Sequence, residues 1–299
     1  MIRHAAHQVV TEELRRWIVA QAEAGCRPED VIGAMRASGW DESVAIDAME
    51  STLRARLDAV AQQRAGEAKV AAAAVPVPEP DLADAPHLVL PESLADDAQA
   101  AQVRVLLSLR EPRLVVFQGL LSDDECVQLR ALAAPRLLRS ETVDTSTGGS
   151  EVNAARTSDG MFFERAETAL IERIERRISA LLRWPAERGE GLQILRYRPG
   201  AEYRPHHDYF DPAAPGSSTL LERGGQRVAT VVMYLNTPER GGATIFPDLT
   251  LEVSPLQGHA VFFAYDRPHP ATRTLHGGAP VLAGEKWVAT KWLRERRFV

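Results

Sequence analysis

Three amphipathic runs open the chain. Each carries apolar residues at helical spacing, and each starts at a residue that commonly begins a helix: Thr11 and Asp41 as N-caps and Pro28 in a first turn. We therefore predict a small unit of three helices within residues 1–66.

From residue 98 onward the hydrophobic period changes from helical to alternating. Val103, Val105 and Leu107 alternate with polar positions, and a second strand-like run, RLVVFQ, follows. After Gln193 the chain consists of short apolar runs between proline and glycine turns, such as LQILRYRPG, RVATVVMYLN and KWVATKWL. This pattern predicts a mainly β domain, built as a β-sandwich or jelly roll.

Two helices are predicted to support one sheet of this domain. The sequence SDDE at residues 122–125 is a capping box, and Cys126, Leu129 and Leu132 are expected to form the buried face of the helix that follows. A second helix is predicted over residues 164–183, where apolar residues keep helical spacing.

Residues 67–97 separate the two regions. They are rich in alanine and proline and carry 1 basic against 7 acidic side chains, whereas residues 98–299 carry 26 basic and 24 acidic side chains. The prolines prevent a continuous helix, so we expect an extended, semi-rigid linker. The expected organisation is thus a helical unit (1–66), this linker and one larger domain (98–299).

Composition excludes several classes of protein. Apolar residues are 45% and charged residues 25% of the chain, as in ordinary globular proteins. The formal net charge of −6 argues against a general nucleic-acid binder. No apolar run is long enough for a transmembrane helix, the first residues lack a signal-peptide core, and the two cysteines lie far apart. We therefore expect a cytoplasmic protein with neither a membrane nor a nucleic acid as partner.

The candidate chemistry centres on a His-x-Asp pair. His206 and Asp208 lie two positions apart in a strand-like run, so they would share one face while His207 points away. His276 is the candidate for a third ligand. Two histidines and one carboxylate leave three positions of an octahedral metal open, which suits non-haem Fe(II) that must bind a cosubstrate and O₂. A His-x-Asp pair alone more often has a surface or core role than a metal-binding one.

Lys286 is a second candidate, because lysine is scarce in this chain and this one follows His276 in an alternating run. It is either a solvated lysine at a strand edge or a point charge that faces a ligand carboxylate. An iron ion held by one carboxylate keeps one net positive charge, and a dicarboxylic 2-oxo acid brings two negative charges. One buried cation would restore neutrality, which favours the second interpretation.

Six segments between about Glu111 and Leu293 together carry a family resemblance. They are PRLVVFQGLLSDDEC, RTSDGMFF, EGLQILRYRPGAEYRPHHDYF, GGQRVATVVMYLNTPERGGATIF, GHAVFF and LHGGAPVLAGEKWVATKWL. In this order they resemble the prolyl 4-hydroxylase branch of the Fe(II)/2-oxoglutarate-dependent dioxygenases. The resemblance implies a double-stranded β-helix (jelly roll) as the catalytic domain.

The resemblance also implies roles for individual residues. The implied iron ligands are His206, Asp208 and His276. The implied partners of the distal 2-oxoglutarate carboxylate are Lys286, Tyr197 and Thr244. The positions that line the peptide groove are matched by Arg227, Glu190, Tyr203 and Trp292. Two other interpretations stay open here, namely a surface arginine at 227 and a core aromatic at 292.

By the same resemblance, the expected activity is hydroxylation of a C–H bond, with 2-oxoglutarate converted to succinate and CO₂ and with L-ascorbate keeping the iron reduced. Peptidyl proline is the expected substrate, bound under mobile loops at 145–150 and 211–225. The alternatives are a hydroxylase of a free amino acid or small natural product, and a non-catalytic cupin-like binding module. The prolines of the linker, in VPVPEP, are a further candidate substrate.

The helical unit resembles ubiquitin-associated-like domains over about 45 residues, which carry the turn Ser38-Gly39-Trp40. Such a unit is expected to bind a protein partner or to self-associate. An equally weighted alternative is a purely stabilising or dimerising appendage.

Overall fold

The computed structural model describes residues 8–71, 74–82, 87–90, 94, 102–140, 142–143, 150–151 and 157–299. The chain divides into two compact units, Met1–Ala72 and Ala73–Val299. None of the helices in the described ranges combines the length and the apolarity that a membrane crossing requires.

The first unit consists of three helices, α1 (Glu12–Glu23), α2 (Pro28–Ala37) and α3 (Glu42–Ala71). Thr11 caps α1 by accepting a hydrogen bond from the backbone N–H of Leu14. The first turn of α2 begins with Pro28. The carboxylate of Asp41 accepts a hydrogen bond from the backbone N–H of Ser43 at the start of α3. The buried core is formed by Ile18, Val31, Met35, Ala45 and Ala48.

The boundary expected at residue 66 is wrong. Helix α3 continues to Ala71, and the first unit ends at Ala72. Alanine has the highest helix propensity, and no proline occurs before Pro76, so the alanine-rich run continues the helix through Gly66.

Residues 74–82 of the expected linker pack on the rest of the second unit. Val75, Val77 and Leu82 pack against its main core, and Pro78 and Pro80 are buried. The backbone N–H of Val75 donates to the carbonyl of Asp266 at 2.8 Å. The segment is extended, as its prolines predict, but it is part of the second unit because its valines and leucine bury apolar surface there.

The large sheet of the second unit has nine strands, each antiparallel to its neighbours. In spatial order they are β1 (His87–Val89), β2 (Gln102–Leu109), β3 (Leu114–Gln118), β14 (Ala260–Ala264), β10 (Arg227–Tyr234), β17 (Lys286–Arg294), β8 (Leu192–Tyr197), β7 (Asp159–Phe163) and β4 (Leu138–Arg139).

A smaller sheet has the order β13 (Leu251–Val253), β12 (Thr244–Phe246), β15 (His276–Gly278) and β9 (Tyr203–His206). Two ribbons pair β11 (Arg240–Gly241) with β16 (Val281–Ala283), and β5 (Thr142–Val143) with β6 (Ser150–Glu151). One hydrophobic cluster joins the two sheets: it combines side chains of the large sheet, such as Val232 and Phe263, with Phe246 and Val253 of the small sheet. Two packed antiparallel sheets of this kind form a jelly roll, so the predicted fold class is confirmed.

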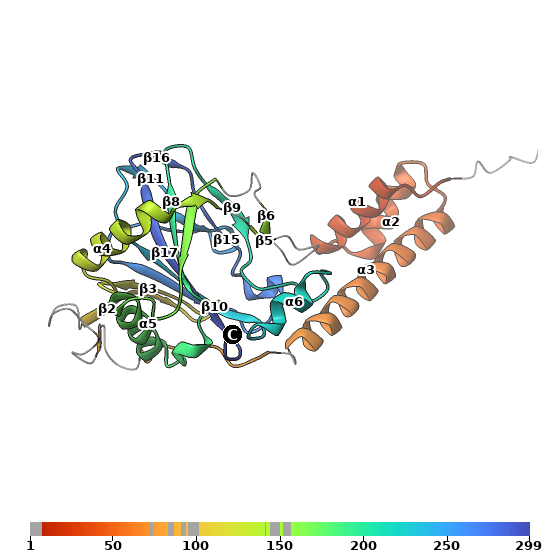
Figure 1. Ribbon diagram of the computed structural model, residues 1–299. Coiled ribbons are helices and arrows are strands. Elements are labelled where there is room, and N and C mark those ends of the chain that lie inside the picture. Colours follow the sequence, from red (N-terminus) through yellow and green to blue (C-terminus); the bar gives the residue numbers. More distant parts are fainter. Residues whose placement is uncertain are drawn as a thin grey trace, which may run out of the picture. The chain divides into compact units, whose positions relative to one another are not determined.

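Two helices cover the other face of the large sheet, α4 (Asp123–Ala133) and α5 (Ala169–Leu182) (Figure 1). Their apolar faces share one core with strand residues such as Val115 and Phe117, which alternate with Leu114 and Val116 of the cluster between the sheets. The remaining short helices are η2 (Ala134–Arg136), η3 (Ala186–Arg188), α6 (Ser217–Glu222), η4 (Pro247–Leu249) and η5 (Pro270–Thr272).

The capping box predicted at residues 122–125 is present at the start of α4. Cys126 and Leu129 are buried as predicted, but Leu132 is 42% exposed and Ala133 takes its place in the core. Helix α5 begins five residues later than predicted, because the side chain of Thr168 caps it by accepting from the backbone N–H of Ile171.

Candidate active site

The three predicted metal ligands meet where two strands of the small sheet pair. His206 ends β9, and Asp208 follows two residues later. His276 begins β15, and in the antiparallel register of the two strands it lies opposite His206. Strand pairing therefore brings together two histidines that are far apart in the sequence.

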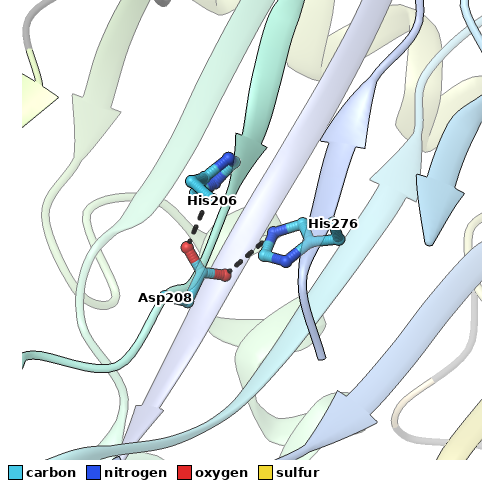
Figure 2. A group of neighbouring side chains, drawn as sticks. All are labelled: His206, Asp208 and His276. Carbon is cyan, nitrogen blue, oxygen red and sulfur yellow. Dashed lines mark ion pairs between the residues drawn. The ribbon is translucent and has the colours of Figure 1, made fainter. Parts of the chain in front are cut away.

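The three side chains point toward one another, as Figure 2 shows. The Oδ1 atom of Asp208 lies 3.5 Å from Nε2 of His206, and its Oδ2 atom lies 3.4 Å from Nε2 of His276. One ligand atom from each residue lies within 4.8 Å of the other two, and the described residues contain no second cluster of this kind. Two imidazoles and a carboxylate around one point form a donor set that fits Fe(II).

The backbone fixes the orientation of both rings. Nδ1 of His206 lies 2.9 Å from the carbonyl oxygen of Arg204, and Nδ1 of His276 lies 2.9 Å from that of Thr274. A carbonyl only accepts hydrogen bonds, so each Nδ1 carries the hydrogen and each Nε2 presents a lone pair to the centre. Burial and the neighbouring His276 lower the pKa of His206, which keeps the ring in the neutral form that metal binding requires.

Two residues that the sequence did not reveal hold Asp208. The hydroxyl of Thr230 on β10 donates to Oδ2 of Asp208 at 2.7 Å, and the hydroxyl of Tyr265 lies 2.9 Å from the same threonine oxygen. The one hydrogen of Thr230 goes to the carboxylate, so Tyr265 donates to Thr230. Burial opposes ionisation of Asp208, but His276 and His206 hold its pKa well below the ordinary value, so the group is a carboxylate.

Lys286 is the first residue of β17, and its side chain lies in the space between the sheets. Its side chain is buried, and its Nζ atom lies 5.6 Å from the ring centre of Tyr197 and 5.8 Å from that of Tyr234. Burial lowers its pKa to about 7. The described residues offer this ammonium neither a hydrogen bond nor a carboxylate, so the site fits an anionic ligand group.

The other two predicted 2-oxoglutarate contacts lie beside Lys286. In the antiparallel register Tyr197 on β8 is directly opposite Lys286. Thr244 on β12 accepts a hydrogen bond of 2.8 Å from the hydroxyl of Tyr234, which leaves its own hydroxyl hydrogen free to donate. Burial raises the pKa of Tyr234, so this phenol stays protonated. Tyr234 is a third site residue that the sequence did not reveal.

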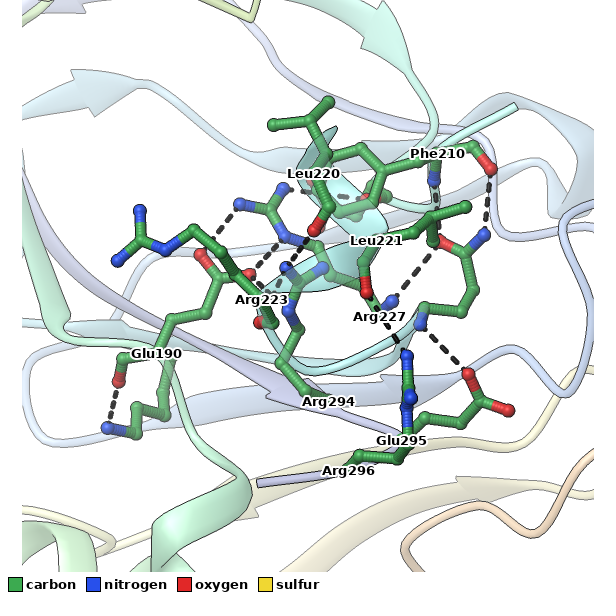
Figure 3. A network of polar contacts seen from close by, with 12 residues as sticks. Glu190, Phe210, Leu220, Leu221, Arg223, Arg227, Arg294, Glu295 and Arg296 are labelled. Carbon is green, nitrogen blue, oxygen red and sulfur yellow. Dashed lines mark hydrogen bonds and ion pairs between the residues drawn. The ribbon is translucent and has the colours of Figure 1, made fainter. Parts of the chain in front are cut away.

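Three of the four predicted groove residues form one cluster. The guanidinium of Arg227 donates to both carboxylate oxygens of Glu190, at 2.6 and 2.9 Å, and lies 3.9 Å above the ring of Trp292. Arg227 is therefore not a surface arginine. Glu190 is also 3.4 Å from Arg294, so its carboxylate is engaged by two arginines (Figure 3). The fourth residue, Tyr203, stacks on His206 with ring centres 3.7 Å apart.

The two expected mobile loops are residues 145–150 and 211–225. Residues 145–149 lie outside the described residues. Residues 211–225 contain helix α6, and many contacts hold this segment to the rest of the second unit.

The chain is similar in sequence to several known proteins. Residues 192–294 match the family model of the 2OG-Fe(II) oxygenase superfamily. Prolyl 4-hydroxylase 1 of Arabidopsis thaliana is 43% identical over 203 residues, which are 62% of this chain and 70% of that protein. Prolyl 4-hydroxylase 5 of the same plant is 40% identical over 209 residues, 63% of this chain and 70% of that protein. A solved viral collagen prolyl hydroxylase from Paramecium bursaria Chlorella virus-1 is 30% identical, with a TM-score of 0.47 over 60% of this chain and 94% of that chain.

Proposed function

Because this chain belongs to the prolyl 4-hydroxylase-like family of 2OG-Fe(II) oxygenases, it is a 2-oxoglutarate-dependent dioxygenase that hydroxylates proline, and we propose that its substrate is a proline within a peptide or protein segment. The observation that carries this proposal is the position of the Arg227–Trp292 cluster beside the His206–Asp208–His276 centre. A non-catalytic binding module is not favoured, since the complete donor set and the buried lysine are both present.

Bound Fe(II) and 2-oxoglutarate supply the oxidising chemistry, in which 2-oxoglutarate is decarboxylated to succinate and an oxygen atom of O₂ enters a C–H bond. The chain contributes binding, orientation and exclusion of water. His206, Asp208 and His276 hold the metal with their ligand atoms already directed. Lys286 compensates the charge of the distal carboxylate of 2-oxoglutarate, with Tyr197 and Thr244 as hydrogen-bond donors to it.

The peptide is positioned by the cluster next to the metal. The guanidinium of Arg227 lies over the ring of Trp292, and Glu190 holds it there by accepting hydrogen bonds from Nε and Nη2. An extended proline-containing segment loses little conformational entropy when it binds beside such a cluster. The names of the relatives, which are prolyl 4-hydroxylases, support peptidyl proline over a free amino acid or small natural product.

Three further parts of the proposal go beyond the site. Ascorbate is proposed as the reductant that keeps the iron active. The cytoplasm is proposed as the location, supported by two free cysteines, one in each unit, Cys26 and Cys126. The helical unit is proposed to bind a protein partner or a second copy of itself.

The chain's own VPVPEP segment is a poor substrate in the folded protein. Pro78 and Pro80 are buried, and Glu79 between them is held by an ion pair with Arg113 at 2.6 Å. Only Pro76 of the three prolines is exposed. Mass spectrometry after turnover is expected to find no added oxygen on Pro78 or Pro80.

The proposed function is tested by succinate formation from 2-oxoglutarate with Fe(II), ascorbate and a panel of proline-containing peptides. Peptide-stimulated turnover is expected in the wild type and should vanish in His206→Ala. The matched control is His207→Ala, because the neighbouring ring stacks on Tyr209 instead of facing the centre. A different outcome would contradict the peptide substrate. If no peptide stimulates turnover, but His206→Ala still abolishes it, the substrate is a small molecule.

A further inference from the structure

The segment between Asp208 and Arg227 joins the metal centre to the peptide cluster. It leaves the centre at Asp208, carries helix α6 (Ser217–Glu222), and returns at Arg227, the first residue of β10. The two ends also touch directly, since Nη1 of Arg227 lies 3.4 Å from the carbonyl oxygen of Asp208. Contacts that hold the two ends of this segment together therefore set the distance between the metal centre and the Arg227–Trp292 cluster.

The side chain of Gln226 holds the two ends of this segment together. Its side-chain oxygen accepts from the backbone N–H of Phe210 at 2.7 Å, and its side-chain nitrogen donates to the carbonyl of Phe210 at 2.8 Å. The side chain of Gln226 is buried, so the amide replaces water for both backbone groups. One side chain thus ties together two residues that stand next to the site, Phe210 two after Asp208 and Gln226 directly before Arg227.

Glu295 holds Gln226 in turn. The backbone N–H of Gln226 donates to Oε2 of Glu295 at 2.9 Å, and the backbone N–H of Glu295 donates to the carbonyl of Gln226 at 2.9 Å. The carboxylate approaches so closely that a Cβ on Gly225 would lie 2.6 Å from Oε2 of Glu295. The glycine is needed there for this contact as well as for its φ of +76°.

Two arginines from the same segment hold the end of α6. Nη2 of Arg294 donates to the carbonyls of Leu220 and Arg223 at 2.7 and 3.1 Å, and Nη2 of Arg296 donates to the carbonyl of Leu221 at 3.2 Å (Figure 3). Carbonyls at a helix C-terminus lack partners within the helix, and cationic side chains satisfy them well. Arg294 also faces Glu190, so the same side chain reaches both α6 and the partner of Arg227.

We propose that Gln226 is a positioning residue for the hydroxylation and that it acts together with Glu295, Arg294 and Arg296, which we call the α6 clasp. The clasp keeps Asp208 and Arg227 in register, so that a peptide held on Arg227 and Trp292 presents its C–H bond at the metal. This proposal rests on the proposed function, because it assigns the groove to a peptide. Lys286 and Tyr197 lie outside the clasp, so 2-oxoglutarate binding does not depend on it.

The test replaces Gln226 by leucine, which has a similar volume and no amide. The KM for a peptide substrate is expected to rise about 10-fold because Arg227 shifts relative to the metal centre, while the KM for 2-oxoglutarate stays within about twofold. The ratio of succinate to hydroxyproline is expected to increase, because cosubstrate is consumed without a correctly placed C–H bond. The matched control is Gln128→Ala, an exposed glutamine on α4.

A second pair of variants gives a result even if Gln226→Leu does not fold. Glu295→Gln keeps an oxygen that accepts from Gln226 and is expected to resemble the wild type, whereas Glu295→Ala is expected to shift peptide KM in the same direction as Gln226→Leu. Equal peptide KM values and equal product ratios in Glu295→Ala and Glu295→Gln would overturn the proposal.

Hydrogen exchange separates this proposal from the proposed function, since it needs no substrate. Backbone amides of residues 210–225 are expected to exchange faster in Glu295→Ala than in the wild type. Unchanged exchange would refute the clasp whatever the activity shows. A second outcome separates the two proposals. If no peptide stimulates the wild type but residues 210–225 exchange faster in Glu295→Ala, the clasp is supported, whereas the peptide substrate and the positioning role are refuted.

Discussion

At the scale of single residues, the candidate centre depends on where a few hydrogens point. The carbonyls of Arg204 and Thr274 select the tautomer of the two histidines, and the hydroxyl of Thr230 is directed at Asp208. Such contacts prepare the ligands before a metal arrives, so their loss should weaken metal binding without removing any ligand.

Thr230→Val is the sharpest test of this preparation. It keeps the shape of the side chain and removes the hydroxyl that donates to Asp208. We expect Fe(II) to bind about 10- to 100-fold more weakly, measured by anaerobic titration. Thr230→Ser, which keeps the hydroxyl, should bind nearly as the wild type does. Equal affinities for the valine and serine variants would contradict the role given to this contact.

Lys286 gives the site a pH dependence. Its pKa is lowered to about 7 by burial, against an ordinary value of 10.5. The dianionic ligand needs the charged lysine, so above pH 7 binding must be accompanied by uptake of a proton. The affinity for 2-oxoglutarate is therefore expected to fall by up to about tenfold for each pH unit above 7.

Calorimetry in two buffers of different ionisation enthalpy measures this proton uptake directly. Uptake should be near zero well below pH 7 and approach one proton well above it. Lys286→Arg stays charged at every pH of the experiment and should remove the dependence. A wild-type affinity that is flat across this range would show that another group sets the charge.

At the scale of elements, helix α4 is tied to α5 by a buried ion pair. Arg177 donates to both carboxylate oxygens of Glu125 at 2.6 and 2.9 Å, and neither side chain is exposed. Glu125 is also the capping-box residue of α4. We expect Glu125→Ala to lower the free energy of unfolding by about 3–5 kcal/mol, because it leaves a buried charge without a partner.

Urea unfolding of the second unit would measure this loss. The control is Arg173→Ala, since Arg173 contacts the same carboxylate at 3.2 Å from a partly exposed position. Its effect should stay below about 1 kcal/mol. If both variants lose a similar free energy of unfolding, the buried ion pair between Glu125 and Arg177 does not account for the loss in Glu125→Ala.

The same elements show what the sequence could predict. The capping box at 122–125 was predictable because it involves four consecutive residues, but its partner Arg177 comes from another helix. The pairing of Lys286 with Tyr197, and of Thr230 with Asp208, depends on how strands align across the jelly roll, which no local pattern encodes. The glycines and serines of residues 211–225 predict a loop and give no signal for helix α6. A helix of six residues has little stability of its own, and Arg294 and Arg296 hold this one by hydrogen bonds from outside the segment.

At the scale of the whole molecule, every candidate site residue lies in the second unit. Removing residues 1–72 is therefore expected to leave 2-oxoglutarate turnover within about twofold of the full chain. Removing residues 1–97, the boundary expected from composition, should lower the melting temperature. That deletion also removes strand β1 and the core contacts of Val75, Val77 and Leu82.

Thermal unfolding and succinate formation of the two deletion variants test this prediction together. Equal melting temperatures would mean that residues 74–90 act as a free linker after all. A loss of turnover on removal of residues 1–72 alone would instead give the helical unit a part in the reaction.

The pairing of His276 with His206 across β15 and β9 has a consequence for how the protein acquires its metal. The two rings meet only after the intervening strands have been synthesised and arranged, so a chain emerging from the ribosome has no complete ligand set until β15 is made. Contacts this distant in sequence form late and slowly during folding. Because the complete ligand set exists only in the finished jelly roll, iron binds the folded domain more tightly than its unfolded precursors and shifts the equilibrium toward the native fold. Metal supply and protein folding are thereby linked, and a cell short of iron would hold a larger share of this enzyme in a form open to proteases.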